Sequence, residues 1–236
     1  MSPQTVHQYA EKVALVSDAA SPIGRAVAMQ LALQGSYVIG LFPAGGRGNV
    51  NELVELGTLA HAVALDPSGT DGANFAAAEA ERLFGRLDLL VNCLKFRPES
   101  SFETMTESDF MNTVNRNFGA AYFLTRAVFG LMKGRPKPKI VNLISTIGDK
   151  GEPLFDAMQS AVAGLTRSLA SEFPKNFRVN CVEVREGKSR QQNETEMLRD
   201  SGVVAPDEVA RAVLFLLSSE SAAMNGQVLK LGSVEQ

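Results

Sequence analysis

Short apolar runs alternate with longer amphipathic segments along the whole chain. The apolar runs are rich in β-branched residues and lack a strict polar alternation, which is typical of strands buried on both faces. They predict strands at 13–17, 37–42, 60–65, 87–93, 139–145, 178–184 and 227–231. Segments with helical periodicity lie between them, at 23–34, about 49–57, 71–84, 106–133, 153–173 and 207–218.

This regular alternation predicts an α/β fold. Strands that alternate with helices form a doubly wound parallel sheet, here of about seven strands, with helices on both faces and right-handed crossovers. The loops 43–49 and 133–139 are rich in Gly and Pro but are too short to separate domains. We therefore expect residues 1–236 to form a single domain.

Composition and charge exclude several classes of partner. A net charge of −3 argues against nucleic acid or an anionic membrane as the main partner. The apolar runs are too short to cross a bilayer, and the first residues lack the apolar segment of a secretory signal. Cys93 and Cys181 lie inside apolar runs, as expected for buried free thiols in a cytoplasmic protein. His7 and His61 stand alone, so no metal site is predicted.

The turn from Ser17 to Gly24 lies between the first predicted strand and the first helix. Dinucleotide-binding folds hold a pyrophosphate at this place, on a glycine-rich turn. Here Asp18 and Pro22 stand where glycines are favoured, and only Gly24 remains. Pro22 removes an N–H donor, and the Asp18 carboxylate would repel phosphate. The alternative is a capped helix, with Asp18 or Ser21 as the cap and Pro22 in the first turn. The sequence favours the capped helix.

Several segments together resemble the short-chain dehydrogenase/reductase family over almost the full length. They are the first turn, "NRNFGAAYFLTRA", "KIVNLISTIG", "GLTRSLASEF" and the last helix–strand unit from "PDEVARAVLFLL" to "QVLKL". The resemblance implies a Rossmann-type sheet that binds NAD or NADP. It assigns Gly24 to the phosphate turn, Phe42 to the ribose-selecting position, and Asp66 to the adenine contact. Lys95 replaces a glycine after the fourth strand.

The resemblance also places the residues of proton transfer. Asn117 and Ser145 match the family's catalytic Asn and Ser. The family's Tyr-x-x-x-Lys pair supplies the general acid and the cation that lowers its pKa. Counted about thirteen residues after the serine, the aligned residues are Met158 and Val162, which transfer no protons. Asn117, Ser145, Gly24 and Asp66 are thus interpreted as vestigial, with local structural roles favoured.

Charged residues after the predicted strands suggest that the crevice could bind a ligand other than a nicotinamide cofactor. Lys95, Arg97 and Arg185 are expected near the carboxyl ends of the strands, where such sheets bind ligands. They could hold an anionic group such as a coenzyme A phosphate, or they could fill the cofactor crevice with salt bridges. The sequence favours the second reading.

The altered positions all belong to cofactor binding or proton transfer, whereas the apolar scaffold is kept. We therefore predict a non-catalytic subunit, a pseudoenzyme that binds no cofactor and is inactive on its own. It would assemble with an active paralogue in a hetero-oligomer, expected to be a tetramer, as in heteromeric acyl-CoA dehydrogenases with one inactive subunit; a homo-oligomer is the other option. Two alternatives stay open. One is an atypical oxidoreductase that uses NAD or NADP with an altered active site. The other is a regulatory protein that binds a ligand in the crevice.

Overall fold

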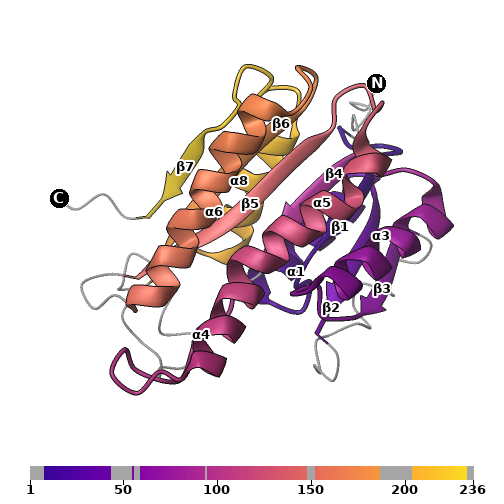
Figure 1. The fold of residues 1–236 in the computed structure, drawn as a ribbon. Helices are drawn as coiled ribbons and strands as arrows, with labels where there is room; N and C mark the ends of the chain where they lie inside the picture. The colour runs from indigo at the N-terminus through magenta and orange to yellow at the C-terminus, as the bar shows by residue number, and fades with distance from the viewer. Residues whose placement is uncertain are drawn as a thin grey trace, which may run out of the picture.

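A seven-stranded parallel sheet forms the centre of the computed structural model (Figure 1), which describes residues 8–43, 55, 59–93, 95–147, 152–186 and 204–232. The predicted helix at about 49–57 lies outside these residues, apart from residue 55. The strand order is β3-β2-β1-β4-β5-β6-β7, and each neighbouring pair is parallel. The strands are β1 (Val13–Val16), β2 (Tyr37–Phe42), β3 (Ala60–Ala64), β4 (Leu89–Asn92), β5 (Lys139–Ile147), β6 (Arg178–Glu186) and β7 (Val228–Leu231).

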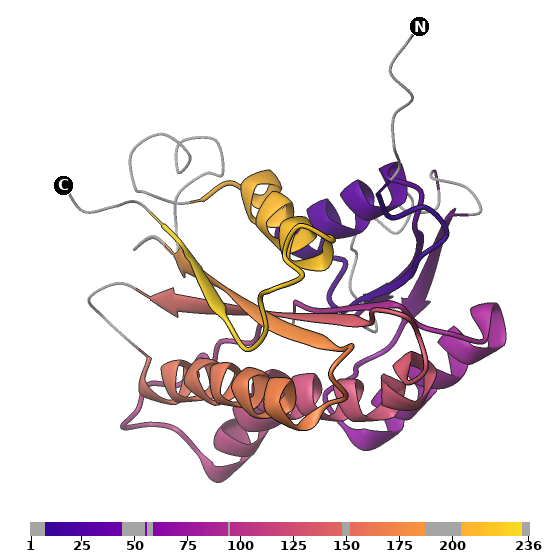
Figure 2. The same ribbon diagram turned by 90° about the horizontal axis from the view of Figure 1, so that it is seen from above.

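Helices cover both faces of the sheet, as the alternation of elements predicts (Figure 2). One face carries α1 (Pro22–Leu33) and α8 (Pro206–Leu217), and the other carries α3 (Thr70–Phe84), α4 (Glu107–Val114), α5 (Ala120–Met132) and α6 (Pro153–Glu172). The predicted doubly wound fold is therefore confirmed. None of the helices in the described residues combines the length and apolarity that a bilayer crossing needs.

The direction in which successive strands are added to the sheet reverses between β1 and β4, and this sets the position of the site. From β1 the chain winds outward to β2 and β3, then returns to β4 on the other side of β1. In open parallel sheets a crevice opens at such a switch point, beyond the carboxyl ends of the strands. The loops that follow β1 and β4 are thus placed side by side at the edge where ligands bind.

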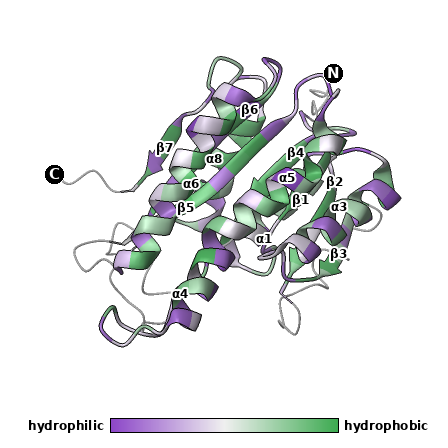
Figure 3. Ribbon diagram, viewed as in Figure 1, coloured by the Kyte–Doolittle hydropathy of each residue, from purple (hydrophilic) through white to green (hydrophobic). Residues whose placement is uncertain are grey.

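The two larger cores, one on each face of the sheet, explain why the strands are largely apolar. Residues of alternating strand positions pack against α1 and α8 on one face, with Val16 and Val91 among them, and against α3 and α5 on the other, with Leu15 and Leu90 among them. All four of these side chains are fully buried. Figure 3 shows the same division, since the central strands are green and the polar residues gather on the outer faces of the helices.

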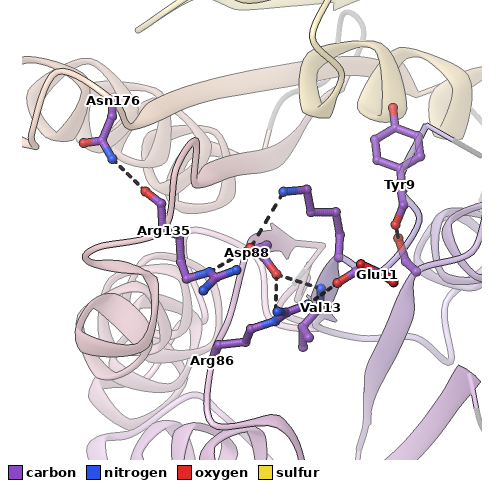
Figure 4. A network of polar contacts seen from close by, with 9 residues as sticks. Tyr9, Glu11, Val13, Arg86, Asp88, Arg135 and Asn176 are labelled. Carbon is purple, nitrogen blue, oxygen red and sulfur yellow. Dashed lines mark hydrogen bonds and ion pairs between the residues drawn. The ribbon is translucent and has the colours of Figure 1, made fainter.

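A buried carboxylate fixes the amino-terminal edge of the sheet, opposite the ligand-binding edge (Figure 4). The Asp88 side chain is 3% exposed, and its Oδ2 accepts a hydrogen bond of 3.0 Å from the backbone N–H of Val13. Three cations surround it, with Arg135 Nε at 3.0 Å, Arg86 Nε at 3.4 Å and Lys12 Nζ at 3.9 Å. Asp88 therefore joins β1 to β4 and to the loop after α5.

Candidate active site

The turn between β1 and α1 is a capped helix start, as the sequence favours. The Ser21 hydroxyl accepts a hydrogen bond of 3.1 Å from Gly24 N and donates one of 2.8 Å to the Asp18 carbonyl. Pro22 is the first residue of α1. Asp18 has φ of 48°, in the left-handed region that glycine adopts most readily and that Asp tolerates. A Cβ on Gly24 would lie 2.2 Å from the Asp18 carbonyl oxygen. The turn thus keeps a glycine-like backbone at Asp18, although only Gly24 remains of the expected glycines.

A pocket of about 290 Å³ opens beside this turn, at the carboxyl ends of the strands. Its lining combines apolar residues from β2 and the loop after β3 with charged residues from the turn, the loop after β4 and the start of the helix that follows α4. It is lined by Asp18, Leu41, Phe42, Pro43, Leu65, Asp66, Pro67, Lys95, Phe96, Asn112 and Arg116. An apolar wall next to polar groups is the kind of surface that accepts a nucleoside.

The charged side chains of the pocket influence one another. Burial raises the pKa of Asp18 to about 6, and the positive charges of Lys95 and Arg116, together with hydrogen bonds from Ser21, oppose this rise. Asp66 is engaged locally, because its Oδ1 accepts a hydrogen bond of 2.9 Å from Ser68 N. Two cations and two carboxylates therefore share this pocket.

A second group of polar side chains is buried where β5 meets the helices. Asn117 donates from Nδ2 to the carbonyls of Phe96 and Thr113, both at 2.8 Å, and its Oδ1 accepts from Phe96 N at 3.0 Å. The Gln159 amide joins Asn117 to Ser145, since its Nε2 donates to Asn117 Oδ1 at 3.3 Å and its Oε1 accepts from Ser145 N at 2.9 Å. The structure thus brings Asn117 and Ser145 together through a residue that the sequence did not single out.

A π-helical turn places Asn117. The predicted helix at 106–133 consists of α4, the π-helical turn η2 (Asn115–Gly119) and α5. Such turns insert an extra residue into a helix and are frequent at functional sites. Here the turn carries Arg116 into the nucleotide-sized pocket and Asn117 into the buried polar group. Helical periodicity alone does not reveal this change of phase.

The hydrogen bonds of this polar group run through Gln159 and not through Met158 or Val162. Val162 packs in a small core with Ala121, Ile144 and Cys181, and Met158 is half-buried. The helix face that reaches Ser145 carries Gln159 and, one turn earlier, the fully buried Phe155. The guanidinium carbon of Arg97 lies 5.2 Å from the centre of the Phe155 ring. The detectable signal for Gln159 is its polarity on the apolar face of α6, between buried Phe155 and Val162.

The comparison with known proteins covers nearly the whole chain. Residues 19–232 match the family model described as enoyl-(acyl carrier protein) reductase. The chain belongs to the short-chain dehydrogenase/reductase family. It is 30% identical over 237 residues to the 3-oxoacyl-[acyl-carrier-protein] reductase FabG of Thermotoga maritima, with 92% of this chain and 95% of the relative covered. It is 28% identical over 232 residues to the (2S)-[(R)-hydroxy(phenyl)methyl]succinyl-CoA dehydrogenase subunit BbsD of Thauera aromatica, with 92% and 94% covered.

Solved structures agree with this assignment. A short-chain dehydrogenase/reductase family protein matches with a TM-score of 0.79 and 28% identity, over 95% of this chain and 97% of the other. The ligand-free aldohexose dehydrogenase of Thermoplasma acidophilum has the same fold, with a TM-score of 0.82, 22% identity, and 95% and 94% of the two chains covered.

Two sequence-based predictions are corrected by these findings. The prediction of a non-catalytic subunit is wrong, because the full-length relatives are named as reductases and as a dehydrogenase subunit. The prediction of no cofactor is wrong, because the family uses NAD(P)H. The prediction rested on the residue types Asp18 and Pro22, which replace glycines in the first turn. The folded turn nevertheless gives Asp18 a φ of 48°, in the left-handed region that glycine adopts most readily. The expected paralogous partner stays a prediction.

Proposed function

We propose that this short-chain dehydrogenase/reductase is an NAD(P)-dependent oxidoreductase that interconverts a carbonyl and a hydroxyl group β to an acyl thioester. The observation that carries the proposal is the buried Asn117–Gln159–Ser145 group, which reaches the nucleotide-sized pocket through Phe96. The names of the relatives support the substrate class, since FabG is a 3-oxoacyl reductase and BbsD belongs to a hydroxyacyl-CoA dehydrogenase.

The residues around the pocket fit the adenosine end of the cofactor. Leu41 and Leu65 supply an apolar wall for the base. Lys95 and Arg116 supply positive charge for phosphate groups. When bound, the nicotinamide ring supplies or accepts the hydride.

Substrate binding falls to the second polar group. The Ser145 hydroxyl, 6% exposed as a residue, is the group that we assign to the substrate oxygen. Its backbone is held by Gln159, and Gln159 is in turn held by Asn117, so the serine is fixed at the end of a buried hydrogen-bond chain. This preorganisation lets Ser145 donate a hydrogen bond to a developing alkoxide without rearrangement.

We infer that Phe155 and Gln159 occupy the positions that the family fills with Tyr and Lys. They are four residues apart on α6, and Gln159 contacts both Ser145 and the Asn117 amide. Neither side chain titrates near neutral pH. The proton that completes carbonyl reduction therefore comes from water, and turnover lacks the factor of roughly 10²–10⁴ that a positioned general acid contributes.

The test is a sensitive assay of the purified full-length protein. NADPH or NADH oxidation with acetoacetyl-CoA, and the reverse reaction with 3-hydroxybutyryl-CoA, are followed at high enzyme concentration. We expect slow turnover that falls at least about tenfold in Ser145→Ala, because a catalytic hydrogen bond to the oxyanion is lost. This variant keeps the backbone N–H that bonds to Gln159. Absence of turnover in both directions, together with no calorimetric binding of either nucleotide, would overturn the proposal.

A further inference from the structure

We propose that Arg97 binds a carboxylate of the substrate, so that the preferred substrate is an acyl thioester that also carries a free carboxylate. The inference rests on the proposed function, because that function places the substrate oxygen at Ser145 and gives Phe155 the position of the family's tyrosine. It adds a residue that determines substrate specificity and that is not among the residues lining the cofactor pocket.

The loop after β4 fixes the point from which the Arg97 side chain extends. The Asn117 amide accepts a hydrogen bond of 3.0 Å from Phe96 N and donates one of 2.8 Å to Phe96 O. Asn117 is 2% exposed, so solvent does not compete for these bonds. Phe96 lines the cofactor pocket, whereas the next residue, Arg97, extends to α6. Consecutive residues of one clamped loop thus serve different regions of the molecule.

The Arg97 side chain ends on the helix face that carries the substrate-binding groups. Its guanidinium carbon lies 5.2 Å from the centre of the fully buried Phe155 ring. Contact with an aromatic ring holds the guanidinium plane, so less conformational entropy is lost when it binds a carboxylate in a bidentate manner. One turn further along α6, Gln159 accepts a hydrogen bond of 2.9 Å from Ser145 N. A supported cation therefore lies beside the region where the reacting carbonyl is expected.

A cavity of about 350 Å³ borders this contact and leaves space for an acyl group. Its lining includes Pro98, the residue after the arginine, and Leu154, the residue before the phenylalanine. Glu99 and Glu152 line it as well, and their carboxylates repel another negative charge inside the cavity. The cavity therefore suits the uncharged part of a substrate, and the carboxylate is expected at the Arg97 guanidinium.

The chemistry of arginine restricts what Arg97 can do at this place. A guanidinium group stays charged in proteins, so it does not supply the proton of carbonyl reduction. Its planar fork of N–H donors matches the two oxygens of a carboxylate and forms charge-assisted hydrogen bonds with them. Recognition of an anionic group, and not proton transfer, is therefore the role that fits this residue.

Calorimetric titration with succinyl-CoA and butyryl-CoA, with and without excess NADP⁺, tests the inference without any assay of turnover. The acyl groups have equal length, and they differ in a terminal carboxylate against a methyl group. We expect wild-type protein to bind succinyl-CoA at least about tenfold more tightly, because charge-assisted hydrogen bonds form with Arg97. Arg97→Gln should reduce this preference to less than about twofold and change butyryl-CoA binding less than about twofold. Arg211→Gln, at an exposed ion pair with Glu208 on α8, is the matched control and should keep the preference.

A second variant keeps the charge and changes only the shape of the cation. Arg97→Lys should bind succinyl-CoA about three- to tenfold more weakly than wild type, because an ammonium group cannot bind a carboxylate through a planar pair of donors. Circular dichroism shows whether each variant is folded. If Arg97→Gln does not fold, Arg97→Lys decides the question, and an unchanged affinity for succinyl-CoA in that variant would count against the assignment of Arg97.

The outcomes separate this inference from the proposed function. Equal affinities of wild-type protein for the two ligands, no measurable binding of either, or a preference that survives Arg97→Gln would overturn the inference. An equal loss of affinity for both ligands in Arg97→Gln would also overturn it, because the guanidinium would then bind the coenzyme A part. Reduction of acetoacetyl-CoA by a protein that fails these tests would leave the proposed function standing. A preference that depends on Arg97, in a protein that reduces no 3-oxoacyl thioester, would support the carboxylate site and refute the proposed function.

Discussion

Replacement of Phe155 by Tyr and Gln159 by Lys should convert a slow enzyme into a faster one. The double variant places a phenol and an ammonium group one turn apart on α6, on the face that reaches Ser145. A positioned general acid contributes roughly 10²–10⁴ to the rate. The lysine should lower the pKa of the introduced tyrosine by about 1–3 from its ordinary value near 10. The double variant should therefore reduce the carbonyl faster than wild type. Its rate should fall when the pH exceeds the lowered pKa of the tyrosine, because the phenol then has no proton to donate.

The structure also sets the cost of this change. Gln159 Oε1 accepts from Ser145 N at 2.9 Å, and Gln159 Nε2 donates to Asn117 Oδ1 at 3.3 Å. Lysine has no acceptor, so Ser145 N loses its partner, and a buried unsatisfied group costs about 1–3 kcal/mol. Gln159 is 3% exposed, so the ammonium group is also poorly solvated. We expect the double variant to unfold at lower urea concentration, while Phe155→Tyr alone keeps the Gln159 bonds and more of the stability.

The assay is NADPH oxidation with acetoacetyl-CoA from pH 6 to 10, with urea unfolding of each variant measured in parallel. Met158→Tyr with Val162→Lys is the matched control, because it introduces the same two groups on the same helix. Val162 lies in a core with Ala121, Ile144 and Cys181, so this control should gain no activity and lose stability. A folded Phe155→Tyr/Gln159→Lys protein no faster than wild type, or a control that gains as much, would refute the assignment of the two positions.

Three further predictions concern stability. Asp88→Ala leaves Val13 N and three cations without their common partner. Urea titration should show a free energy of unfolding lower by about 3 kcal/mol. A change below about 1 kcal/mol would contradict the role given to Asp88. Asp18→Asn should raise stability at pH 7.5 by up to about 3 kcal/mol, because the carboxyl pKa rises from 3.8 to about 6 on folding. Between pH 3.8 and about 6 the folded state holds a proton that the unfolded chain releases. The stability of the wild-type protein therefore falls as the pH rises through this range. The gain in stability from the Asn substitution should vanish at about pH 3.5, where both states are protonated. Gly24→Ala should lower the free energy of unfolding by about 1–3 kcal/mol, since the Cβ of the alanine would lie 2.2 Å from the Asp18 carbonyl oxygen. Calorimetry should also show weaker binding of NADPH. Unchanged stability and binding would mean that the turn adjusts to the methyl group without cost.

The sequence predicts the fold well because its signals are local and repeated. Each strand from β1 to β7 is a short apolar run, and the predicted boundaries of α1, α3, α6 and α8 lie within one residue of the observed ones. Two-sided burial and the alternation of elements suffice for this, since they depend on periodicity alone. The interruption of the 106–133 helix by η2 escapes such reasoning, because a π-helical turn changes the phase without breaking the apolar pattern.

The site is less predictable because it depends on loop lengths and backbone conformation. A count of residues from Ser145 leads to Met158 and Val162, but the loop between β5 and α6 decides which helix position faces the serine, and Gln159 is the residue that does so. Similarly, the identity of Asp18 suggests repulsion of phosphate, whereas its φ of 48°, which glycine adopts most readily, is seen only in the folded chain. Side-chain chemistry is visible in a sequence, but the direction in which it points is a property of the folded chain.

The position of Asp88 has a consequence for how this protein can change over evolutionary time. The ion cluster that ties β1 to β4 lies at the edge of the sheet remote from the reactive groups. Amino-acid replacements among the loops that meet substrate therefore leave this anchor intact. Mutations at the carboxyl ends of the strands can therefore change the specificity, while the ion cluster at the amino ends keeps the sheet stable. This separation makes the protein a suitable starting point for laboratory selection of altered specificity.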